Sequence, residues 1–92
     1  MPLTGSALRR QKMNLRNRDR KRPLRSEART RVRHAREAIA AGDLEAAARK
    51  VQHAVSHLDR AATRGALHRR NASRRKSRIQ KALNRAAAQA QE

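Results

Sequence analysis

Apolar residues recur at helical spacing along the last two thirds of the chain. Ala28, Val32, Ala35 and Ile39 follow one another at intervals of four, three and four residues, which places them on one helix face. A second set has the same period: Leu44, Ala47, Val51, Ala54, Val55, Leu58, Ala61 and Ala62. A third set comprises Ile79, Ala82, Leu83, Ala86 and Ala90. Because β-branched residues are too few for a sheet, this pattern predicts an all-α protein with three helices.

Glycine and capping residues mark the ends of these helices. Gly42 and Gly65 each follow a periodic segment, at the position where a left-handed residue commonly ends a helix. Ser6 and Asp43 are the predicted N-caps of the first two helices. We therefore expect a single domain, 1–92, with a basic arm and helix one at 1–41, helix two at 43–64 and helix three at 67–90. Such short connections favour an antiparallel three-helix bundle.

The first part of helix one has too few large aliphatic residues to form a core. Within this helix, the large aliphatic residues before the first apolar set are only Leu8, Leu15 and Leu24. We interpret this stretch as a basic arm in which the long first helix projects beyond the bundle. Pro23 lies inside it, and proline removes a backbone donor and clashes with the preceding turn. The sequence leaves two alternatives, a kinked helix or a break between the arm and a shorter helix.

Charge is large and unevenly distributed. The 92 residues include 25 Lys and Arg against 7 acids, giving a net charge of +18. Residues 1–36 hold 13 basic side chains and 2 acids, and residues 37–66 hold 4 of each. Residues 67–92 hold 8 basic side chains and 1 acid. Such an excess points to a polyanionic partner, most often nucleic acid. The chain has no Phe, Tyr or Trp to stack on bases, so recognition by backbone charge and shape is expected.

The basic clusters supply the candidate phosphate contacts. Arginine outnumbers lysine 20 to 5, and its planar guanidinium can hold a phosphate with two hydrogen bonds. A solvated basic face is the alternative for any single residue. Arg31 belongs to the same cluster as Arg29 and Arg33. The other candidates are Arg9, Arg10, Lys12, Arg16, Arg18, Arg20, Lys21, Arg22, Arg25, Arg29, Arg33, Arg69, Arg70, Arg74, Arg75, Lys76 and Arg78.

Several other classes of protein find no support. There is no cysteine, and His53 and His57, four residues apart, lack a third ligand, so we expect no metal and no cofactor. No apolar run approaches the ~20 residues of a membrane-spanning helix, and no signal peptide is evident, which favours the cytoplasm. Without a glycine-rich phosphate loop or a carboxylate pair, an enzyme with a small-molecule substrate is not expected.

Two turns and the start of the last helix resemble a known family. The segments 38–43 and 59–69, together with Lys76, Ser77, Arg78 and Ile79, are similar to the bacterial small-subunit ribosomal protein twenty family. Arg70, the Arg20–Lys21 pair and Pro23 depart from its pattern. The resemblance implies a three-helix bundle with a long first helix, and direct binding to 16S ribosomal RNA in the small (30S) subunit that stabilises its folding and assembly. It also implies location on the ribosome with few protein neighbours.

The resemblance adds two residues to the candidate RNA contacts, His68 in the second turn and Ser77 in the last helix. For His68 a structural role is the open alternative.

Two other functions remain to be distinguished. A nucleoid-type DNA binder shares the charge and helicity, but the sequence has neither a recognition-helix motif nor a minor-groove wedge. A membrane-active amphipathic helix needs Trp, Phe or a Leu-rich face in the basic segments, and these are absent.

Overall fold

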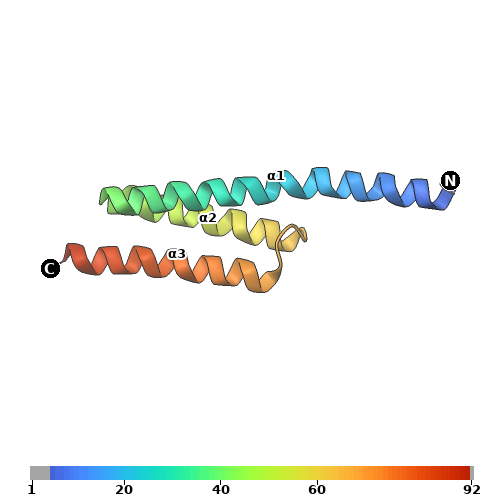
Figure 1. Ribbon diagram of the computed structural model, residues 1–92. Coiled ribbons are helices and arrows are strands. Elements are labelled where there is room, and N and C mark those ends of the chain that lie inside the picture. Colours follow the sequence, from blue (N-terminus) through green and yellow to red (C-terminus); the bar gives the residue numbers. More distant parts are fainter. Residues whose placement is uncertain (1–4, 92) are drawn as a thin grey trace.

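Three helices form an elongated bundle (Figure 1). The computed structural model describes residues 5–91, in which α1 spans Gly5–Ala41, α2 spans Leu44–Thr63 and α3 spans Arg69–Ala90. Successive helices run antiparallel, and no strand occurs in the described part of the chain. The molecule measures 68 × 20 × 18 Å. The predicted fold, an antiparallel three-helix bundle with a long first helix, is confirmed.

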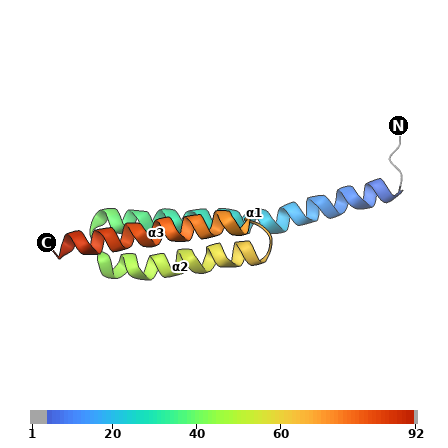
Figure 2. The ribbon, with the colours of Figure 1, turned by 90° about the horizontal axis from the view of Figure 1, so that it is seen from below.

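The N-terminal part of α1 projects beyond the other two helices as an arm. With 37 residues, α1 has a length of about 55 Å. Figures 1 and 2 show its first turns extending past the connection between α2 and α3, with no other helix beside them. Every residue from Leu8 to Arg20 is exposed. The arm is therefore helical, as predicted, although nothing in the bundle packs against it.

Helix α1 continues without interruption through Pro23. A break at this position, one of the two alternatives, is wrong. Proline cannot donate to the carbonyl four residues earlier, on Asp19, but both residues are exposed, so water can satisfy that carbonyl. Helical packing resumes at once, since Leu24 is half-buried and Ala28 is buried. Figure 2 shows only a gentle change of direction between the arm and the bundle.

Capping fixes the first turn between helices. The carboxylate of Asp43 accepts a hydrogen bond from the Ala46 amide at 3.2 Å, which confirms the predicted N-cap. Gly42 has a φ of +81° and Gly65 a φ of +75°, the left-handed conformation that favours glycine at helix C-termini. Ser6, by contrast, lies inside α1, which begins at Gly5, so its prediction as an N-cap is wrong.

The core is small and rich in alanine. It joins side chains from all three helices, and within residues 5–91 only Leu58 and Ile79 are large and fully buried. Ala38 is buried although the predicted set omitted it, whereas Ala90, which was included, is exposed because it lies at the end of α3. The central cluster consists of Ala28, Val32, Ala35, Val51, Ala54, Leu58 and Ile79, with Ile39, Val55, Leu67 and Leu83 packed around it.

A histidine also joins α1 to α2. His57 Nδ1 lies 2.8 Å from the His53 carbonyl oxygen, and His57 Nε2 lies 3.2 Å from Glu27 Oε1. His57 is therefore a structural link between the helices. Across residues 5–91, no group of three His, Asp or Glu side chains could hold a metal ion.

Replacing Leu58 with alanine is expected to destabilise the bundle by about 2–5 kcal/mol, because it leaves a cavity at a fully buried position. Urea unfolding followed by circular dichroism measures this change. The control, Leu8→Ala, removes the same atoms from a side chain that is 44% exposed on the arm, and should cost less than about 0.5 kcal/mol. Equal effects of the two substitutions would contradict the assignment of Leu58 to the core.

Candidate nucleic-acid interface

Six arginines follow one face of α1 from the arm into the bundle. Counting from Arg18, they recur at intervals of four, three, four, four and three residues, which keeps them on one side of a helix for about 27 Å. All six side chains are exposed. We call this set the arginine stripe: Arg18, Arg22, Arg25, Arg29, Arg33 and Arg36.

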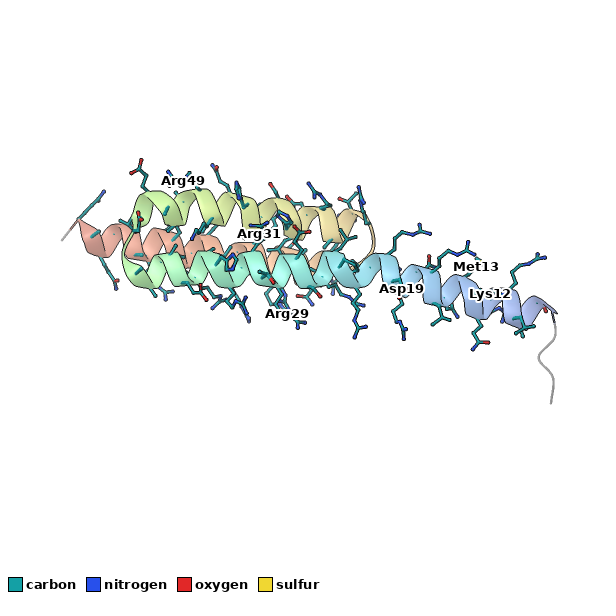
Figure 3. The ribbon with its side chains drawn as sticks, turned by 90° about the horizontal axis from the view of Figure 1, so that it is seen from above. Lys12, Met13, Asp19, Arg29, Arg31 and Arg49 are labelled. Atoms are coloured by element: carbon teal, nitrogen blue, oxygen red, sulfur yellow. The ribbon has the colours of Figure 1, made fainter. Side chains whose placement is uncertain are left out.

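The stripe consists mostly of predicted contacts. Arg36 was missed, although its spacing from Arg29 and Arg33 could have revealed it. Within the stripe, only Arg33 has an ion pair with a described residue, Glu37 at 3.9 Å. Both side chains are about two-thirds exposed, so water weakens this pair strongly. Arg31 does not belong to the stripe, because it lies on the opposite side of α1 from Arg29 (Figure 3).

Other cations surround the arm. Figure 3 shows side chains leaving it in several directions, with Lys12 among them. Arg9, Arg10, Arg16 and Arg20 are likewise exposed, and none of them is ion-paired with any residue in the range 5–91. A helix with cations around its circumference can neutralise backbone on more than one side of a nucleic-acid groove.

The root of the arm meets the turn between α2 and α3. Lys21 Nζ lies 3.9 Å from the place that a Cβ on Gly65 would occupy. Arg20, Lys21 and Arg64 line one hollow of about 430 Å³, together with Asn17 and Leu24. The fold thus brings cations from α1 and from the end of α2 together. Arg64 was absent from the predicted set, because only the folded turn places it beside the arm.

The N-terminus of α3 adds a second concave, basic surface. His68 is its N-cap, and His68 Nδ1 accepts a hydrogen bond from the Arg70 amide at 3.2 Å. This contact gives His68 the structural role that was left open. An open depression of about 820 Å³ is lined by Gly65, Leu67, His68, Arg69, Arg70 and Ser73. Backbone amides at a helix N-terminus attract anions, which suits this depression to phosphate.

Further along α3, some of the predicted contact residues are exposed, whereas others already form hydrogen bonds within the protein. Arg74, Ser77 and Arg78 are exposed. Arg75 Nε donates to Asn71 Oδ1 at 2.7 Å, and Lys76 Nζ donates to Asp59 Oδ1 at 2.7 Å. The Lys76 ammonium is therefore partly neutralised from α2. An incoming phosphate must compete with the Asp59 carboxylate for it.

Exposed arginines on a helical scaffold are typical of small proteins that bind polyanions. None of the described helices is long and apolar enough to cross a membrane. A family model described as Ribosomal protein S20 matches residues 3–84. The chain belongs to the ribosomal protein S20 family. This finding confirms the family predicted from the turns, and, because these are ribosomal proteins, the prediction that the chain is not an enzyme.

Individual relatives agree along nearly the whole chain. Small ribosomal subunit protein bS20 of Thermomicrobium roseum is 54% identical over 91% of this chain and 85% of its own length. The protein of the same description from Cutibacterium acnes is 43% identical over 96% of this chain and 100% of its own. That from Shouchella clausii is also 43% identical, over 91% and 96% respectively.

Asp59→Asn is expected to increase affinity for duplex RNA about two- to fivefold, because it releases the Lys76 ammonium as well as removing a negative charge. Filter binding at constant salt measures the change. Glu45→Gln is the matched control: it removes one exposed carboxylate from α2 that has no ion pair with any described residue. An equal gain for both variants would show that the Lys76–Asp59 pair does not limit binding.

Proposed function

We propose that this protein is a structural constituent of the small ribosomal subunit that binds 16S ribosomal RNA directly and stabilises its folding and assembly. The single observation that supports this most is the arginine stripe, which presents six exposed guanidinium groups along one face of α1. Family membership supports the same conclusion, since the relatives are described as small ribosomal subunit proteins. Its location is then the ribosome in the cytoplasm.

The mechanism is phosphate neutralisation. Each guanidinium that contacts a phosphate releases condensed counterions, so affinity falls steeply as salt rises. In A-form RNA the bases lie in a deep, narrow groove, and side chains meet backbone and ribose instead. A chain without aromatic rings is suited to this mode. Contacts with RNA also stabilise the arm, because a ligand that binds only the ordered state shifts the equilibrium toward that state.

Contacts with RNA rather than with proteins account best for the surface. Among the described residues, the exposed large apolar side chains are Leu8, Met13 and Leu15, all on the arm. Protein interfaces generally need a buried apolar centre with large anchoring side chains. Within the described residues, the three-helix part of the molecule has no exposed large apolar side chain to anchor a protein partner. This supports the expectation of few protein neighbours.

A titration of the purified protein against 16S ribosomal RNA and against random duplex DNA, over a salt series with competitor RNA, tests the proposal. We expect preferential binding to the ribosomal RNA that survives competitor at physiological salt. Equal affinity for both nucleic acids, lost together as salt rises, would overturn the ribosomal function and favour a nucleoid-type DNA binder.

Substitutions in the arginine stripe should weaken this binding selectively. For Arg25→Gln/Arg29→Gln we expect a loss of about ten- to a hundredfold and a salt dependence smaller by about two phosphate contacts. The control, Arg60→Gln/Lys81→Gln, removes the same charge from exposed positions outside the candidate set, so it should lose less than about threefold. Indistinguishable losses would show that net charge, and not the stripe, determines binding.

A further inference from the structure

A separate basic pocket lies between α1 and α2. Its volume is about 210 Å³, and its lining residues are Arg31, His34, Ala46, Arg49, Lys50 and His53. Figure 3 shows Arg31 on the side of α1 that faces α2, whereas Arg29 of the arginine stripe points from the opposite side. This pocket, which we call the α1–α2 pocket, therefore lies on a different face of the molecule from the stripe.

The charge of the α1–α2 pocket has one sign. Arg31, Arg49 and Lys50 are cations, His34 and His53 are further nitrogen donors, and no carboxylate is in the lining. Among the described residues Glu27 pairs with this cluster, and its Oε1 lies 3.8 Å from Arg31 Nη2. That separation exceeds hydrogen-bond length, and both side chains are more than 40% exposed, so Glu27 neutralises Arg31 only weakly.

One donor in this cluster is buried without an acceptor. Arg31 Nε is shielded from solvent and has no hydrogen-bond partner among residues 5–91. Leaving a buried donor unpaired costs free energy, and the cost is greater for a charged group. The rest of this side chain is accessible, since it is 41% exposed, and an anion with several acceptor oxygens would neutralise Arg31 and its neighbours at the same time. Phosphate matches the fork of guanidinium donors in geometry.

We propose that the α1–α2 pocket binds a phosphodiester group of RNA. The choice of RNA as the ligand rests on the proposed function, whereas the existence of an anion-binding pocket does not. Residues 37–66 hold equal numbers of basic and acidic side chains. Two of their cations, Arg49 and Lys50, nevertheless line the pocket with Arg31, and their acids lie outside the lining. The proposal therefore gives this formally neutral segment a binding role. An acidic peptide fits less well, since the lining includes no large apolar residue to anchor one.

The first test uses inorganic phosphate and the full chain. In ¹⁵N-resolved NMR spectra, the Nε–H signal of Arg31 should shift saturably with phosphate, together with the backbone amides of Arg49 and Lys50. The same titration with chloride at equal ionic strength is the control and should leave these signals in place. Shifts of equal size at arginines throughout the chain would indicate general counterion association and overturn the proposal.

The second test uses RNA. Arg49→Gln/Lys50→Gln should weaken binding to 16S ribosomal RNA about tenfold and lower the salt dependence by about one contact. Both side chains are exposed, so circular dichroism should show an intact fold. Arg60→Gln/Lys81→Gln again removes the same charge elsewhere, and its loss should be less than about threefold.

The outcomes separate this inference from the proposed function. If the Arg49/Lys50 variant behaves like the control while Arg25→Gln/Arg29→Gln loses affinity, RNA does not occupy the α1–α2 pocket, yet the ribosomal function stands. If the unaltered protein shows no preference for ribosomal RNA but phosphate still shifts the Arg31 signal, the pocket binds anions and RNA is not its ligand. Binding of an acidic peptide in competition with phosphate would also overturn the assignment to RNA.

Discussion

Repulsion between like charges is the constraint on which this structure depends. Twenty-five basic side chains occur on 92 residues, and the fold separates them from the few apolar ones. The arginine stripe follows one face of α1, while Ala28, Val32 and Ala35 point into the bundle. Along the arm, which is also rich in cations, no other helix is beside α1 at all. A polyanion therefore does more than occupy a surface: it removes the main electrostatic penalty of the folded state.

The small core follows from the same constraint. With so many charged positions, only Leu58 and Ile79 remain as large, fully buried side chains in the part of the chain that the structure describes, and alanine fills most other inward positions. Alanine contributes little apolar area, but it allows close helix contact and has the highest helix propensity. Local supports add to this modest core, including the Asp43 cap and the link from His57 to Glu27. The bundle is a compact base from which α1 extends.

Periodicity predicted the helices and most of the core, because one helix face is a local property of the sequence. The buried positions Val51, Ala54 and Leu58 follow directly from it. How the helices are rotated about one another is not local. For that reason the Lys76–Asp59 pair, the position of Arg64 at the root of the arm and the turn of Arg31 toward α2 were not predicted. Pro23 left alternatives open because continuity there depends on packing downstream.

The unsupported arm has a consequence for the life of the protein outside its complex. Opening a turn between Leu8 and Arg20 breaks backbone hydrogen bonds but separates no packed side chains, so local unfolding there costs little. Trypsin-like proteases cut after arginine and lysine, which are dense in this segment. Under the proposed function, copies made in excess of the RNA would present ready cleavage sites, and copies bound to it would be shielded. Degradation of the surplus would then adjust the amount of protein to the amount of RNA.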